Sequence, residues 1–118
     1  AAAVKLLNDS DQIVAVGVNC TSPQYIASLV QIAASFTDKL IVVYPNKGEI
    51  WNAENKRWIS ASLQPTHFCD DAKTWHAAGA KIIGGCCRTT PEDIKLISAN
   101  ITYNSTSCIS GNFFFFID

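Results

Sequence analysis

Short apolar runs alternate with segments of helical periodicity along most of this chain. The first run covers residues 13–18 and is rich in β-branched side chains, a second covers residues 40–44, and a short third strand is expected over residues 81–84. Unbroken apolar runs of this length are typical of strands buried on both faces, as in parallel sheets. The alternation therefore predicts an α/β fold whose parallel strands are joined by right-handed crossovers.

Three helices are predicted, one after each strand. The first begins at Ser22 and Pro23, a good N-cap and a proline at the first helical position. The second runs from near residue 66 to Ala78, where Gly79 is placed to end it. The third opens at Thr90, followed by a proline and two acids. The expected apolar stripes are Ile26, Leu29, Val30, Ala33 and Phe36, then Phe68, Ala72 and Trp75, then Ile94, Ile97 and Ile101.

Composition bounds the class of protein. The chain has 118 residues, about one domain, and is 48% hydrophobic and 16% charged, which is the composition of a folded protein. Its net charge is −1 and no basic cluster occurs, so neither nucleic acid nor a membrane is expected as a partner. Five cysteines, an odd number, and the lack of a secretory apolar segment at the start indicate a reducing, cytoplasmic location. Because methionine is absent, we expect a piece of a longer protein.

Three cysteines follow predicted strands directly. Cys20 ends the first strand region, and Cys86 and Cys87 follow the glycine pair 84–85. Parallel strands bring their carboxyl ends to one side of a sheet, in a doubly wound sheet and in a barrel alike. Neighbouring cysteines point to opposite faces of a strand, so both can face one ion only where the strand breaks, which the glycines permit. Three thiolates with an open fourth position suit a catalytic zinc site, whereas the competing interpretation is three small buried side chains.

The remaining cysteines and histidines match no such pattern. Cys69 lies in the second predicted helix and Cys108 near the end of the chain, so both are expected to be non-functional. His67 and His76 lie beside or within the same helix, away from the strand ends, and are not expected to be ligands.

The loop after the second strand supplies further candidates. Asn46 and Gly48 are candidate substrate-binding residues, although an ordinary turn has the same composition. Glu49 and Arg88 either bind a polar substrate or are solvated loop charges. Residues 52–64 form a longer polar stretch to which no helix or strand is assigned.

Three segments together resemble the homocysteine S-methyltransferases, in particular the plant and bacterial enzymes that use S-methylmethionine. The segments are residues 17–21, 44–49 and 84–91, and the resemblance extends over residues 6–100. It implies the last three βα units of an eight-stranded TIM-type barrel, hence an incomplete barrel. The family usually has serine where this chain has Lys47, which is expected to put a bulky charge beside the pocket.

The resemblance also implies a chemistry. Cys20, Cys86 and Cys87 match the family's zinc ligands, and Zn²⁺ would bind the homocysteine thiol, which takes a methyl group from a sulfonium donor, S-methylmethionine being favoured, to give methionine. Residues 1–103 would form a partial homocysteine-binding barrel domain and residues 104–118 a divergent tail. Because the family's first five units are absent, we expect the isolated chain to be inactive. The alternatives are a truncated non-catalytic remnant or interaction fragment, and a thiol redox protein that uses the cysteine pair.

Overall fold

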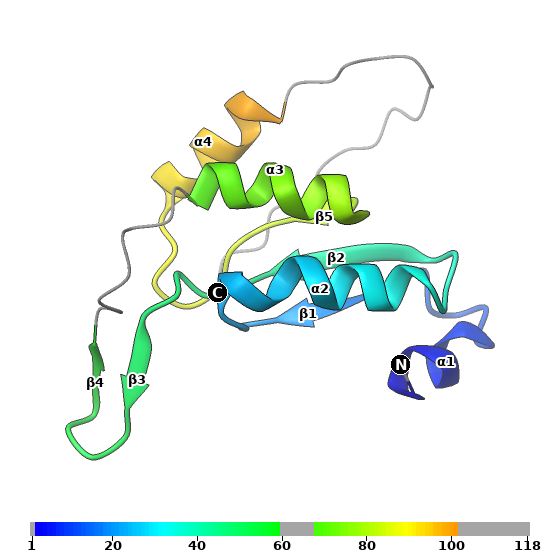
Figure 1. Ribbon diagram of the computed structural model, residues 1–118, viewed down its shortest axis with the longest axis horizontal. Coiled ribbons are helices and arrows are strands. Elements are labelled where there is room, and N and C mark those ends of the chain that lie inside the picture. Colours follow the sequence, from blue (N-terminus) through cyan, green and yellow to red (C-terminus); the bar gives the residue numbers. More distant parts are fainter. Residues whose placement is uncertain (1, 60–67, 102–118) are drawn as a thin grey trace.

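The computed structural model describes residues 2–59 and 68–101. Its first helix precedes a strand, and the strands and helices then follow one another as the sequence patterns predict, with one added hairpin (Figure 1). The elements in chain order are α1 (Ala2–Asn8), β1 (Ala15–Asn19), α2 (Pro23–Ala34), β2 (Leu40–Tyr44), β3 (Ile50–Asn52), β4 (Arg57–Ile59), α3 (Phe68–Ala78), β5 (Ile82–Ile83) and α4 (Pro91–Asn100).

A parallel sheet forms the centre of the described part of the chain. Its strand order is β1-β2-β5, so β2 is the middle strand. Ala15 of β1 pairs with Leu40 of β2, and Val42 of β2 pairs with Ile82 of β5. All three strands run in the same direction, and their carboxyl ends therefore lie at one edge of the sheet. The prediction of an α/β fold with parallel strands is confirmed.

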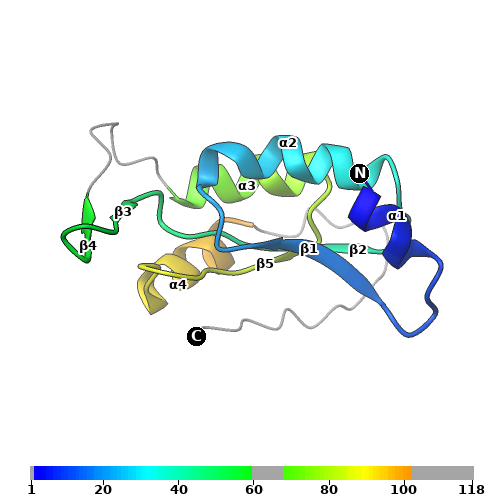
Figure 2. The same cartoon turned by 90° about the horizontal axis from the view of Figure 1, so that it is seen from below.

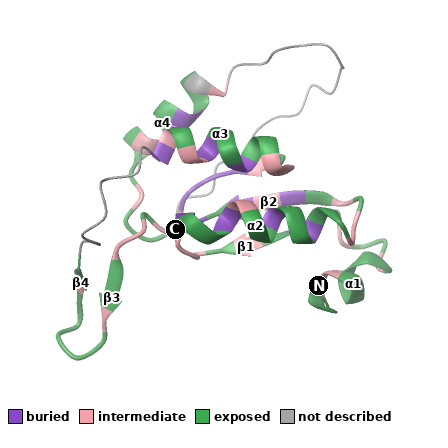
Figure 3. Cartoon of the chain, viewed as in Figure 1, coloured by how far each residue is buried: buried purple, intermediate pink, exposed green. Residues whose placement is uncertain are grey.

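One face of this sheet is buried under helices. Figure 2 shows α2 and α3 on the same side of the strands. The last helix, α4, contacts α3. Figure 3 shows the buried residues gathered where these helices meet the sheet. The side chains that form this core are Val16, Ile26, Val30, Ala33, Ile41, Val43, Phe68, Ala72, Trp75, Ala80, Ile83, Ile94 and Ile97. Burying these apolar side chains is the main source of stability for the described fold.

The helix ends follow the predicted capping chemistry. Thr90 caps α4 and forms a capping box with Asp93, each side chain bonding the other residue's backbone N–H. Gly79 follows α3 with φ +123, and the N–H of Ala80 donates to the carbonyl of Trp75, as in a Schellman motif. Ser22 occupies the N-cap position of α2, but its hydroxyl makes no capping hydrogen bond.

Several boundaries differ from the sequence predictions. The first strand begins at Ala15, since its pairing with β2 begins there, and Val14 is 75% exposed. In β1 only Val16 is buried, so within the described residues this strand is not covered on both faces. Leu29 lies at the exposed edge of α2, and Phe36 lies beyond the end of that helix.

Between β2 and α3, where no strand was predicted, the chain forms a β-hairpin. Strands β3 and β4 pair antiparallel, and Trp51 lies opposite Trp58 with the ring centroids 5.3 Å apart. The short helix α1 was also not predicted and buries no side chain. The predicted tail and the start of the second predicted helix lie outside the described residues. Within residues 2–59 and 68–101, no helix has the length and apolar character needed to cross a membrane.

Candidate metal centre

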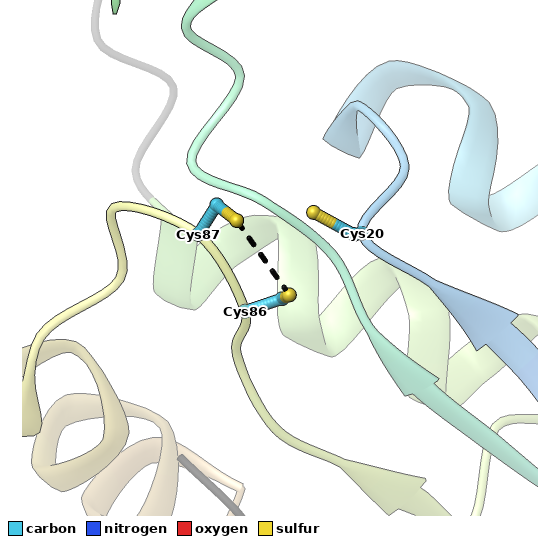
Figure 4. A group of neighbouring side chains, drawn as sticks. All are labelled: Cys20, Cys86 and Cys87. Carbon is cyan, nitrogen blue, oxygen red and sulfur yellow. Dashed lines mark hydrogen bonds between the residues drawn. The ribbon is translucent and has the colours of Figure 1, made fainter. Parts of the chain in front are cut away.

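The three predicted ligand cysteines meet at the carboxyl edge of the sheet. Cys20 directly follows β1, and Cys86 and Cys87 lie in the loop between β5 and α4. Figure 4 shows the three sulfur atoms turned toward one another from these two loops. Because β5 ends at Ile83, the chain has already left the strand at the cysteine pair, so the alternation of side chains no longer applies.

The sulfur positions suit a single ion. All three Sγ atoms lie within 4.8 Å of one another, and those of Cys86 and Cys87 are 4.0 Å apart. A tetrahedral zinc ion with Zn–S bonds of about 2.3 Å needs sulfurs about 3.8 Å apart. The three cysteines therefore need to close by at most about 1 Å, within side-chain motion. No other group of this kind occurs among the residues that the structure describes.

The thiols differ in acidity. Burial disfavours a thiolate at Cys20, but hydrogen bonds with the Cys86 and Cys87 thiols outweigh it, so the pKa of Cys20 lies below its ordinary value. Burial raises the pKa of Cys86 to about 11, and the hydrogen bond with Cys20 adds to this rise. These opposite shifts describe one thiolate, at Cys20, that is stabilised by hydrogen bonds from two neighbouring thiols. A divalent cation between the sulfurs would favour the thiolate form of all three cysteines.

The loop after β2 joins the two cysteine-bearing loops. The Asn46 amide donates from Nδ2 to the Cys20 carbonyl at 3.0 Å and accepts at Oδ1 from the N–H of Gly48 at 2.8 Å. On the other side, the Cys86 N–H donates to the Pro45 carbonyl at 2.9 Å. Asn46 and Gly48 therefore lie beside the cysteine-bearing loops, where the Asn46 side chain holds backbone in place.

Two ligand-loop residues have left-handed backbone conformations. Cys20 has φ 45 and Arg88, next to Cys87, has φ 69. Residues with a Cβ adopt this region rarely and at a cost of about 1–2 kcal/mol. Such strain persists only where the surrounding contacts impose it, and it occurs frequently at functional sites. Here it turns Cys20 out of the strand direction toward the cysteine pair (Figure 4).

Two ion pairs cross between the loops near the cysteines. Lys47 Nζ lies 2.9 Å from Asp93 Oδ2, and Arg88 Nε lies 2.8 Å from Glu49 Oε2. Lys47 therefore reaches to the first turn of α4 rather than standing as a free charge in a pocket, which revises that expectation. Glu49 and Arg88, predicted either to bind substrate or to be solvated, pair with each other.

The other predicted residues lie as follows. Cys69 is in α3, and its thiol donates to the Leu96 carbonyl at 3.6 Å. His76 is in the last turn of the same helix and is not part of the group formed by the three thiols. His67 and Cys108 lie outside the described residues.

Sequence reasoning missed Thr89. Its hydroxyl donates to the Cys86 carbonyl at 2.6 Å, and its N–H donates to the same oxygen at 3.1 Å. These two bonds close the turn that carries the cysteine pair. A threonine in a loop can donate from its hydroxyl to the carbonyl three residues earlier, and Thr89 has this relation to Cys86.

A comparison with protein families gives one match over most of the chain. The profile described as Homocysteine S-methyltransferase matches residues 1–101. This range contains the three cysteines and the loop between them.

Individual proteins agree with the family profile. Homocysteine S-methyltransferase 1 of Brassica oleracea var. italica is 46% identical over 99 residues, which are 83% of this chain and 30% of that protein. Homocysteine S-methyltransferase YbgG of Bacillus subtilis (strain 168) is 46% identical over 93 residues, 79% of this chain and 29% of that protein. The chain thus spans about 30% of the length of the curated relatives it matches.

A solved structure has the same arrangement of strands and helices. The metallated form of the homocysteine methyltransferase MmuM from Escherichia coli superposes with a TM-score of 0.64 at 36% sequence identity. The match covers 83% of this chain and 28% of that protein. The MmuM structure is described as the metallated form. The chain that is similar to it has three thiols within 4.8 Å of one another, at a place where a metal could bind.

Proposed function

Because this chain belongs to the homocysteine S-methyltransferase family, we propose that it carries the zinc-binding part of an enzyme that transfers a methyl group from a sulfonium donor to homocysteine. The observation that supports this proposal is the convergence of the Cys20, Cys86 and Cys87 sulfurs within 4.8 Å of one another. The products would be methionine and the demethylated thioether of the donor. S-methylmethionine is the donor that we favour.

The donor set favours zinc over harder ions. Three sulfurs without a neighbouring carboxylate ligand suit a soft or borderline cation, and three protein ligands leave a fourth tetrahedral position for a substrate sulfur. The ion, when bound, would keep that substrate sulfur as a nucleophilic thiolate near neutral pH. No general base is then needed at the reacting sulfur, because its proton is lost to solvent on binding.

The protein's own contribution is orientation. Asn46 fixes the carbonyl of Cys20, while the loop that it occupies also bonds the backbone of Cys86. We propose that Asn46 and Gly48 border the substrate, with the backbone of this loop defining one wall. The methyl carbon would move from the donor sulfur to the acceptor sulfur in line, so holding both in position supplies much of the rate acceleration.

We further propose that the three strand–helix units are the last three of an eight-unit barrel. The parallel order β1-β2-β5, the position of α2 and α3 on one face and the thiols at the carboxyl edge are all consistent with that architecture. Residues 1–103 would form this partial barrel domain, and residues 104–118 a divergent tail. The substrates would be small molecules.

Metal analysis of the purified chain tests this function directly. The chain should bind one equivalent of Zn²⁺, and Co²⁺ in its place should give intense sulfur-to-metal absorption with tetrahedral d–d bands. Cys86→Ser should lose most of the bound zinc. The matched control is Cys69→Ser, because this thiol lies in α3 and contacts Leu96 instead. Full zinc content in the Cys86 variant, or none in the unmodified chain, would reject the proposal.

A second candidate is a non-catalytic, metal-binding or interaction fragment of the same family. It is favoured by the share of the relatives that this chain covers, about 30%. The two candidates differ in one assay, methyl transfer from S-methylmethionine to homocysteine by the chain alone. Turnover that requires zinc supports the enzyme, whereas stoichiometric zinc binding without turnover supports the fragment. A thiol redox role predicts instead that mild oxidant consumes two thiols and that zinc does not protect them.

A further inference from the structure

Four contacts tie the loop after β2 to the loop that carries the cysteine pair and to the first turn of α4, which follows it. Two are backbone bonds, from the Cys86 N–H to the Pro45 carbonyl at 2.9 Å and from the Lys47 N–H to the Cys87 carbonyl at 3.1 Å. The other two are the ion pairs Lys47–Asp93 and Glu49–Arg88. We call these two ion pairs the cross-loop clamp.

The Lys47–Asp93 pair is more constrained than an ordinary surface ion pair. Lys47 contacts both carboxylate oxygens of Asp93, at 3.1 and 2.9 Å, and the Asp93 side chain is only 12% exposed. Asp93 also accepts from the Thr90 N–H in the capping box of α4. One carboxylate therefore fixes the start of a helix and the loop after β2 at the same time.

The second pair acts on a strained residue. Arg88 directly follows Cys87 and has a left-handed φ of 69. Its guanidinium donates to Glu49, whose side chain is 22% exposed and which directly precedes β3. The pair thus holds the chain in the unfavourable conformation in which it leaves the cysteine pair.

We propose that Lys47, Glu49, Arg88 and Asp93 are positioning residues that hold the cysteine pair at metal-binding distance from Cys20 through the loop after β2. The contacts form a continuous path. The backbone of Pro45 and Lys47 bonds the cysteine pair, and Asn46, which lies between them, bonds the Cys20 carbonyl. This role rests on the proposed metal function. It adds four charged side chains, none of which is a proposed metal ligand.

The clamp has a consequence that separates it from simple electrostatics. Removing the Lys47 charge makes the site more negative, which by charge alone should strengthen the binding of a divalent cation. Removing the Glu49 charge should by the same argument weaken it. The clamp predicts that both changes weaken binding, because each one frees the cysteine-pair loop.

The experiment compares Lys47→Met, Glu49→Gln and the double variant with the unmodified chain. Co²⁺ affinity is measured by competition with a chelator, and amide hydrogen exchange is measured on the metal-free chains at Lys47 and Cys86. We expect each single variant to bind Co²⁺ about two- to four-fold more weakly and the double variant about ten-fold more weakly, as for partly exposed ion pairs. Exchange at both amides should rise by similar factors.

The chain supplies a matched control. Lys73 pairs with Asp70 at 3.4 Å on the exposed surface of α3, so Lys73→Met removes a lysine–aspartate pair that lies within one helix and does not join the two loops. The Ala80 amide, which donates to Trp75 in the core, reports on the global fold in every variant. Neither Co²⁺ affinity nor exchange at Lys47 and Cys86 should change in the control.

The outcomes distinguish the clamp from the function on which it rests. Tighter Co²⁺ binding by Lys47→Met, or unchanged exchange at both amides in the double variant, overturns the clamp while leaving the metal site intact. Faster exchange with unchanged affinity overturns the positioning role. If the unmodified chain binds no Co²⁺, the metal function fails, and the exchange rates alone then decide whether the two pairs hold the loops together.

Discussion

Replacing Gly85 by alanine should disrupt the turn that presents the cysteine pair. Gly85 lies between the end of β5 and Cys86, and its φ is outside the left-handed region, so alanine meets no backbone penalty there. The obstacle is space. A Cβ at this position would lie 2.7 Å from the Thr89 Cβ, 2.9 Å from the Thr89 Cγ2 and closer still to the Thr89 Oγ1.

The cost follows from what Thr89 does. Its hydroxyl and its N–H both donate to the Cys86 carbonyl, at 2.6 and 3.1 Å, so pushing this side chain aside weakens the turn at the metal site. Overpacking of this kind costs about 1–3 kcal/mol, and one lost hydrogen bond costs about 1 kcal/mol. We therefore expect Gly85→Ala to lower the free energy of unfolding by about 2 kcal/mol and to weaken Zn²⁺ binding.

A double-mutant cycle tests this reasoning. Thr89→Gly removes all three atoms that the new Cβ would meet, so in that background Gly85→Ala should cost less than about 0.5 kcal/mol. Urea denaturation followed by tryptophan fluorescence measures both differences, since Trp75 is 1% exposed in the folded core. Equal costs of Gly85→Ala in the two backgrounds would show that contact with Thr89 is not the cause.

Three further predictions concern thiol reactivity, acid stability and a helix end. Without metal at neutral pH, iodoacetamide should label Cys20 faster than Cys86, because the pKa of Cys20 is lowered and that of Cys86 is raised to about 11; peptide mapping that finds equal rates contradicts this. Burial opposes ionisation of Asp93, but the hydrogen bonds from Lys47 and Thr90 together outweigh it and lower the pKa of Asp93 below the ordinary 3.8. This carboxylate's contribution to stability is therefore complete above pH 3.8 and is lost as pH falls through the lower folded value. Lys47→Met should therefore flatten the acid side of the stability profile measured by urea denaturation, and an unchanged slope would reject the link. Gly79→Ala should lower Tm by several degrees in a thermal melt, since φ +123 is strained for alanine, and a Tm equal to that of the unmodified chain would count against the predicted strain.

The parts of the fold that follow from local patterns were predicted from the sequence. The middle strand, residues 40–44, matches the prediction, and α4 begins after Thr90, where the capping residue, the proline and the acids all indicate a helix start. The hairpin was missed because each of its strands has three residues, too few for a recognisable alternation. Its pairing depends on contact between Trp51 and Trp58, and cross-strand contacts leave no local signal.

The cysteine cluster was predictable because parallel strands obey a general rule about their carboxyl ends. No comparable rule places the side chains that support it. Asn46 bonds the carbonyl of a residue 26 positions away, and Lys47 bonds a carboxylate 46 positions away. Neither partner is indicated by spacing, so Asn46 was interpreted as a substrate contact or a turn residue, and Lys47 as a charge beside the pocket.

The order of the strands explains why a loop without a thiol is central to the site. Since β2 lies between β1 and β5, the loop that leaves β2 lies between the loops that supply Cys20 and the cysteine pair (Figure 4). The relative position of the sulfurs is therefore set through this loop, which bonds both neighbours with its backbone and with Asn46. The loop is fixed up to Glu49, and the hairpin begins at the next residue. It follows that the hairpin can vary in length or sequence without moving the thiols, whereas changes within residues 45–49 should alter metal affinity even though none of these residues is a proposed ligand.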